Sequence, residues 1–88
     1  MAGARYRIEF APSARRAFLS LDKAAQKRLR PHIESLAGDP RPAGAKALTG
    51  RRGQLRLRVG DYRIVYVIED DVLLVLVVRV GHRKDVYR

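Results

Sequence analysis

The chain has 88 residues, which is enough for one small domain and too few for a second hydrophobic core. The absence of cysteine excludes a disulfide framework and thiolate metal sites, and it suits a reducing cytoplasm. The 19 Lys and Arg residues against 9 Asp and Glu give a formal net charge of +10, which favours a polyanionic partner such as nucleic acid or an acidic protein. We therefore expect residues 1–88 to form a single domain.

No segment of the sequence predicts insertion into a membrane. The first ten residues lack the apolar core of a signal peptide. The longest apolar run, residues 72–78, is far shorter than the roughly 20 residues that span a bilayer. We therefore expect a cytoplasmic protein that does not insert into membranes.

The first half of the chain predicts one strand and two helices. Apolar and charged residues alternate over residues 6–10, which is typical of a half-buried strand. Pro12 suits the first turn of a helix, whose apolar face would consist of Ala14, Ala17, Phe18 and Leu21. Asp22 is a candidate N-cap for a second helix, with the apolar stripe Ala25, Leu29, Ile33 and Leu36. We expect Pro31 to kink this helix or to split it in two.

The second half predicts a β-meander. A loop over residues 41–53 has room for one short strand near residues 47–49, and from Gln54 onward the hydrophobic period changes to two. Gly60-Asp61 predicts a two-residue turn of type II′, and residues 69–71 predict a second turn before a last strand over residues 72–80. This last strand is apolar on both faces, so we expect an interior position. The predicted fold is α+β in two layers: an N-terminal strand, a two-helix hairpin, and an antiparallel meander of three to four strands.

The predicted hairpin places three arginines on one face of the sheet. Counting from the turn pairs Arg58 with Arg63, and Arg56 shares their face because side chains two residues apart point the same way. Like charges opposite each other destabilise a sheet, so the cluster favours a solvent-facing anion site over a face charged only for solubility. The end of the last strand would bring further candidates to the rim of this face, namely His82, Arg83 and Tyr87.

Other kinds of active site find little support in the sequence. The chain has no HExxH motif, no Walker loop and no Ser-His-Asp order, so metal, nucleotide and triad chemistry are poorly supported. His82 could carry protons, although a single histidine beside an arginine is more often a binding residue or a bystander. His32 is expected on the surface, and Asp70 and Asp71 are expected to have structural roles in a turn.

Two stretches resemble the RelE-type toxins of bacterial and archaeal toxin–antitoxin systems. They are LRLRVGDYRIVY at residues 55–66 and VGHRKDVYR at residues 80–88, and the resemblance extends over nearly the whole chain. It implies a ribosome-dependent endoribonuclease that cuts mRNA in the ribosomal A site without a metal or a cofactor. It also implies three partners: the ribosome, mRNA, and an acidic RelB-like antitoxin bound in a hetero-oligomer.

The same resemblance implies roles for individual residues. The implied catalytic residues are Arg56, Arg63, Arg83 and Tyr87, and the surrounding candidates for RNA binding are Gln54, Arg58, His82, Lys84, Arg51 and Arg52. The paired lysines of the family fall on Gln54 and Arg56, which departs from the family pattern. Neither glutamine nor arginine acts as a base near neutral pH, so Tyr87 is the candidate base if neighbouring cations lower its pKa from about 10.

Two other functions fit the same sequence. The related ParE-type toxins bind DNA gyrase and cleave no RNA, and fold and charge do not separate them from the nucleases. A basic module that binds RNA or ribosomes without catalysis is also consistent with Gln54 and Arg56 in place of lysines. The set of Arg63, Arg83 and Tyr87 favours the nuclease, because a protein that only binds has no need of it.

Overall fold

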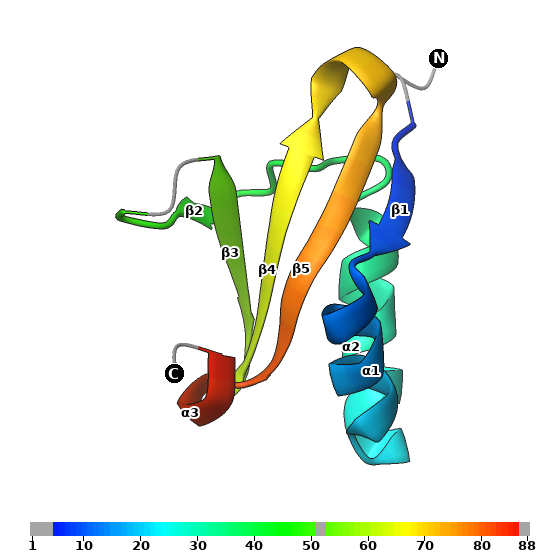
Figure 1. Ribbon diagram of the computed structural model, residues 1–88, viewed down its shortest axis with the longest axis vertical. Coiled ribbons are helices and arrows are strands. Elements are labelled where there is room, and N and C mark those ends of the chain that lie inside the picture. Colours follow the sequence, from blue (N-terminus) through cyan, green and yellow to red (C-terminus); the bar gives the residue numbers. More distant parts are fainter. Residues whose placement is uncertain (1–4, 51–52, 87–88) are drawn as a thin grey trace.

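The computed structural model describes residues 5–50 and 53–86, which fold into one mixed sheet with helices packed against it (Figure 1). In chain order the elements are β1 (Arg7–Phe10), α1 (Pro12–Ser20), α2 (Lys23–Ser35), β2 (Lys46–Ala47), β3 (Gln54–Val59), β4 (Tyr62–Glu69), the 3₁₀ helix η1 (Asp70–Val72), β5 (Leu74–His82) and α3 (Arg83–Val86). The α+β fold and the antiparallel meander from β2 to β5 confirm the prediction.

The sheet has the strand order β1-β5-β4-β3-β2. As predicted, β5 is an interior strand, with β1 on one side and β4 on the other. The pairing of β1 with β5 is parallel, and Arg7 stands opposite Leu74. From β1 the chain passes through α1 and α2 to β2 at the opposite edge of the sheet, and the meander then brings it back to β5 beside β1.

The hairpin of β3 and β4 has the predicted register. Val59 pairs with Tyr62 and Arg58 pairs with Arg63 across the turn. The backbone has a positive φ of 60° at Gly60 and no positive φ at Asp61, as a type II′ turn requires. A side chain at this position would also displace the flexible guanidinium of Arg28 on α2.

The two long helices begin where the sequence predicts, and Pro31 does not divide α2 in two. The Asp22 carboxylate accepts a hydrogen bond from the backbone N–H of Ala25 at 2.8 Å and so caps α2. The helix then continues through Pro31 to Ser35, so the predicted split is wrong. Pro31 lacks the N–H that would bond to the Lys27 carbonyl, and both residues lie on the exposed side of α2.

The hydrophobic core lies between the sheet and helices α1 and α2. Its fully buried side chains come from both layers: Leu29, Leu36, Ile64, Tyr66, Val75 and Val77. The Tyr66 hydroxyl donates a hydrogen bond to the Pro40 carbonyl at 2.8 Å, and burial raises the pKa of Tyr66 to about 12. The core therefore occupies the face of the sheet that meets α1 and α2.

None of the helices in the described part of the chain combines the length and the apolar character needed to cross a membrane.

Candidate nucleic-acid interface

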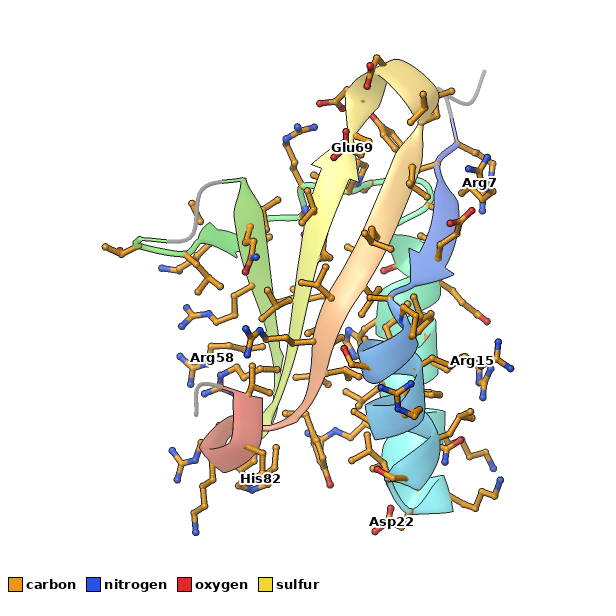
Figure 2. All side chains as sticks on the ribbon, viewed as in Figure 1. Arg7, Arg15, Asp22, Arg58, Glu69 and His82 are labelled. Atoms are coloured by element: carbon orange, nitrogen blue, oxygen red, sulfur yellow. The ribbon has the colours of Figure 1, made fainter. Side chains whose placement is uncertain are left out.

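Basic side chains form two rows across the face of the sheet that points away from α1 and α2. Successive cross-strand partners in the first row are Lys46, Arg56, Val65 and Arg79, and those in the second row are Arg58, Arg63 and Gly81. Partners across strands share a face, and Figure 2 shows Arg58 projecting from β3 on the side away from the long helices. We call the five cations, Lys46, Arg56, Arg58, Arg63 and Arg79, the basic face.

Two members of the basic face, Lys46 and Arg79, are absent from the prediction. Arg79 is the single arginine in the otherwise apolar strand β5, and this is a signal that the sequence does contain. The face to which Arg79 points was harder to predict, because the β4–β5 register shifts between Val65 and Tyr66. Lys46 lies in a strand of two residues, whose pairing with β3 has no local sequence signal.

Arg63 lies on the predicted face of the sheet. We expected its side chain to face solvent, but it is buried. It retains 7% of its exposure. Its Nη1 donates hydrogen bonds to the carbonyls of Gly60 at 3.1 Å and Tyr62 at 3.0 Å. These two hydrogen bonds hold the guanidinium of Arg63 against the hairpin turn. The two carbonyl oxygens replace part of the water that would otherwise solvate its charge.

The chain after β5 folds back as the short helix α3, which was not predicted. Figure 1 shows α3 beside the lower ends of β3, β4 and β5. Val86 keeps 5% of its exposure, and Arg79 Nη1 donates to its carbonyl at 3.3 Å. This bond places an arginine at the carbonyl end of a helix, where a cation is favoured. The basic face and the C-terminal segment are thus in direct contact.

Arg83 lies near the hairpin turn, whereas His82 is the cross-strand partner of Tyr62 and so points to the face of the sheet opposite to Arg63. The backbone N–H of Arg83 donates to the Asp61 carbonyl at 2.7 Å, while its exposed side chain places Nε 3.9 Å from Asp61 Oδ1. The His82 ring packs edge-on against Tyr62, and its Nδ1 accepts a hydrogen bond from the backbone N–H of Lys84 at 3.3 Å. His82 therefore supports the end of β5, whereas the side chain of Lys84 is exposed.

Two polar atoms on β3 are buried without a partner among the described residues. They are Oε1 of Gln54 and Nε of Arg56, whose side chains are neighbours on the same face of the strand. A buried donor or acceptor that makes no hydrogen bond is costly, so such groups are uncommon outside functional sites. Both atoms are closed to solvent, so a ligand would reach them only if the two side chains moved.

Three of the predicted site residues, Arg51, Arg52 and Tyr87, lie outside the described residues. Within the described ranges, the structure brings Gln54, Arg56, Arg58 and Arg63 together on one face and places Arg83 beside the turn. The described part of the chain contains no group of three or more His, Asp or Glu side chains that could hold a metal ion.

The sequence was compared with known protein families and curated proteins. The family model described as "ParE toxin of type II toxin-antitoxin system, parDE" matches residues 8–87. A putative RelE-like toxin protein of Escherichia coli is 33% identical over 87 residues, covering 94% of this chain and 90% of that protein. Toxin RelG of Mycobacterium tuberculosis is also 33% identical over 87 residues, covering 94% of this chain and 97% of that protein.

Solved structures share the fold. The toxin–antitoxin complex RelBE2 from Mycobacterium tuberculosis contains a chain that matches with a TM-score of 0.80 and 29% identity, covering 93% of this chain and 95% of that chain. The isolated RelE toxin of Escherichia coli matches with a TM-score of 0.77 over 90% of this chain and 84% of its own length. At 23% identity, the second match shows the similarity of fold alone.

Proposed function

Because the chain belongs to the RelE/ParE superfamily of toxins of type II toxin–antitoxin systems, we propose that it is a ribosome-dependent, metal-independent endoribonuclease that cleaves mRNA. The observation that carries the proposal is the pairing of Arg58 with Arg63 beside the unpartnered Nε of Arg56. Like charges opposite each other and a buried donor without an acceptor both destabilise the free protein. A bound phosphate would relieve the repulsion between Arg58 and Arg63.

The proposed reaction is attack by the ribose 2′-hydroxyl on the adjacent phosphorus. The 2′-O–P bond forms, the P–5′-O bond breaks, and the products carry a 2′,3′-cyclic phosphate and a 5′-hydroxyl. Arg56 would hold the non-bridging oxygens with Arg58 beside it, and Arg63 would add a fixed positive charge from beneath. Cations held in place before the reaction stabilise the negative charge that builds on the phosphate.

Proton transfer is assigned to residues near the C-terminus. Tyr87 would remove the proton from the 2′-hydroxyl as the general base, and Arg83 would stabilise or protonate the departing 5′-oxygen. The Gln54 side chain could accept a hydrogen bond from a ribose hydroxyl if its buried Oε1 turned outward, but it would not take up the proton. Gln54 is therefore proposed to orient the substrate, with Lys84, His82, Arg51 and Arg52 as further contacts to RNA.

The proposed partners are the ribosome, mRNA and an acidic antitoxin, which would act in the cytoplasm. Among the solved structures that share this fold is a complex of archaeal RelE with RelB from Pyrococcus horikoshii, with a TM-score of 0.77. The net charge of +10 favours an acidic antitoxin, because opposite charge accelerates association. We propose a hetero-oligomer of toxin and antitoxin in which this chain is one domain.

A second candidate function is inhibition of DNA gyrase without RNA cleavage, as in ParE-type toxins. The match of residues 8–87 to the family model of ParE toxins favours it. Against it stands the cluster of groups that phosphate chemistry requires, because a protein that only binds gyrase has no need of them.

Mapping of mRNA 5′-ends after brief expression of the chain tests the proposal. We expect new 5′-ends that fall in phase with codons on translated messages, because the ribosome sets the register of cleavage. DNA damage with intact mRNA would contradict the nuclease and support the gyrase inhibitor. Ribosome binding with neither cleavage nor DNA damage would reduce the chain to a binding module.

A further inference from the structure

His82 is the last residue of β5, and the helix α3 begins at the next residue. The first two backbone N–H groups of α3 both have acceptors outside the helix. The Arg83 N–H donates to the Asp61 carbonyl at 2.7 Å. The Lys84 N–H donates to Nδ1 of His82 at 3.3 Å, and Figure 2 shows the His82 side chain beside α3. His82 therefore has the position and the hydrogen bond of an N-cap residue, whose side chain accepts from the second or third residue of a helix.

Histidine is not among the residues that usually cap helices. Ser, Thr, Asp and Asn are preferred there, and Asp22 caps α2 in this way. The oxygen atoms of these side chains remain acceptors near neutral pH. An imidazole accepts through Nδ1 only in its neutral form, because both ring nitrogens become donors when it is protonated, and imidazoles commonly change charge between pH 5 and 8. The cap of α3 is therefore one that a proton can remove.

Charged groups from several elements surround the end of β5. The cations are Arg28 on α2, whose guanidinium lies against Gly60, and Arg83 and Lys84 on α3. The acids are Asp85 on α3 and Asp61 in the turn, whose carboxylate lies 3.9 Å from Arg83 Nε. The Tyr62 ring packs edge-on against the imidazole. Protonation of His82 would therefore add a positive charge next to two cations of α3, besides removing the acceptor for the Lys84 N–H.

The helix α3 depends on such contacts, because a helix of four residues is not stable by itself. At its far end Val86 is buried, and the Val86 carbonyl accepts a hydrogen bond from Arg79 Nη1 at 3.3 Å. At its start the helix is held by the acceptors from Asp61 and His82. Loss of the His82 acceptor would loosen the first turn, which begins at Arg83. The proposed base Tyr87 directly follows Val86 in the sequence, so it would lose the same support.

We propose that neutral His82 positions the catalytic groups of the C-terminal segment by capping α3, and that a proton on His82 removes the cap and slows cleavage. His82 is then a positioning residue, because it acts through the Lys84 N–H and not on the RNA. The inference rests on the proposed function in taking Arg83 and Tyr87 to act on mRNA. It gives the opposite sign to a contact with phosphate, since a protonated histidine would bind phosphate more tightly.

Two variants of His82 isolate the cap. His82→Asn keeps an acceptor at the N-cap position without a titrating ring, whereas His82→Ala keeps neither. Both variants lose any contact between the ring and RNA, so the difference between them reports the cap. In single-turnover cleavage on programmed ribosomes at pH 8, we expect His82→Ala to be about fivefold slower than His82→Asn, the equivalent of one hydrogen bond of about 1 kcal/mol. Equal rates for the two variants would overturn the proposal.

The pH dependence of cleavage gives the sign of the effect. The ratio of the wild-type rate to that of His82→Asn cancels what the other ionisations contribute. We expect this ratio to fall about fivefold between pH 8 and pH 5.5, because only the wild type loses its cap. The control is His32→Asn, at an exposed position of α2, for which the ratio should stay constant. A ratio for His82→Asn that is constant, or that rises on acidification as a phosphate contact requires, would overturn the proposal.

An NMR titration of the protein without RNA tests the cap by itself. We expect the amide resonance of Lys84 to titrate with the same midpoint as the His82 ring in the wild type, and to be independent of pH over this range in His82→Asn. A Lys84 resonance that does not follow His82 would overturn the cap. A titrating Lys84 amide in a protein that cleaves no mRNA would contradict the proposed nuclease alone, so the two failures are distinguishable.

Discussion

Arg63 and Tyr66 lie three residues apart on β4 and point to opposite faces of the sheet, and both are buried. The Tyr66 hydroxyl has one partner in the core, the Pro40 carbonyl. Arg63 keeps its charge beneath the hairpin turn, where backbone carbonyls accept its hydrogen bonds. One strand thus contributes to stability on one face and to a preorganised positive charge on the other.

Replacement of Tyr66 by Phe tests the first of these roles. The variant loses the hydrogen bond to Pro40, so we expect the free energy of unfolding to fall by about 0.5–1.5 kcal/mol. The pKa of Tyr66 is raised from 10.0 to about 12, so the folded protein binds more protons than the unfolded chain between these values. The stability of the wild type should therefore decrease as the pH rises through this range, and that of Tyr66→Phe should decrease less. Urea titrations at several pH values measure both effects, and parallel pH profiles would contradict the account.

Tyr87→Phe tests the proposed base. The variant keeps the ring and loses only the hydroxyl, so we expect single-turnover cleavage on programmed ribosomes to slow by about 10²–10⁴-fold. We expect the melting temperature to stay nearly the same, because the variant keeps the whole aromatic ring. Cleavage at the wild-type rate would rule out Tyr87 as the base.

At the scale of elements, local chemistry explains which parts of the fold could be predicted. Gly60 and Asp61 determine the turn, and the turn determines every pair between β3 and β4. The parallel partner of β1 depends instead on a long crossover, and α3 depends on the burial of Val86, neither of which has a local signal. The face of Arg79 depends on a register shift between β4 and β5. The prediction therefore included the arginines of the basic face on β3 and β4, and it missed Arg79 on β5.

Asp70 joins three segments that are far apart in the chain. It accepts hydrogen bonds from Arg41 Nη2 at 2.9 Å and from the Tyr6 hydroxyl at 2.6 Å, and these bonds, that of Arg41 foremost, lower the pKa of its carboxyl group. A carboxyl group with a lowered pKa stabilises the fold above its ordinary value of 3.8, and this contribution is lost as the pH falls below that value. We expect Asp70→Asn to reduce the loss of melting temperature between about pH 5 and pH 2. Asp71→Asn is the control, and equal profiles for the two variants would contradict the account.

Val86→Ala tests whether α3 positions the residues that flank it. The variant removes two buried methyl groups, so we expect the free energy of unfolding to decrease by about 1–2 kcal/mol. Cleavage should also slow, because Arg83 begins α3 and the proposed base Tyr87 directly follows Val86 in the sequence. Lys84→Ala, at an exposed position of the same helix, is the control for stability. A destabilised Val86→Ala variant with the wild-type cleavage rate would separate α3 from the reaction.

At the scale of the whole molecule, the two-layer architecture separates stability from binding. The helices and one face of the sheet bury the core, which leaves the opposite face available for cations that repel one another. A net charge of +10 on so small a chain disfavours the compact state through self-repulsion. An anionic ligand or partner would therefore stabilise the folded protein as well as bind to it.

The central claim is that the basic face performs phosphoryl transfer on mRNA. Single-turnover cleavage of mRNA on programmed ribosomes tests it most directly, with wild type, Arg56→Ala and Arg16→Ala compared at equal concentration. We expect Arg56→Ala to slow cleavage by about 10²–10³-fold, the usual loss when one preorganised charge-stabilising group is removed. Arg16→Ala removes the same charge from the helix layer and should leave the rate within about twofold, as is usual for an exposed position away from the site. Equal rates for the two variants, or no cleavage by the wild type, would contradict the claim.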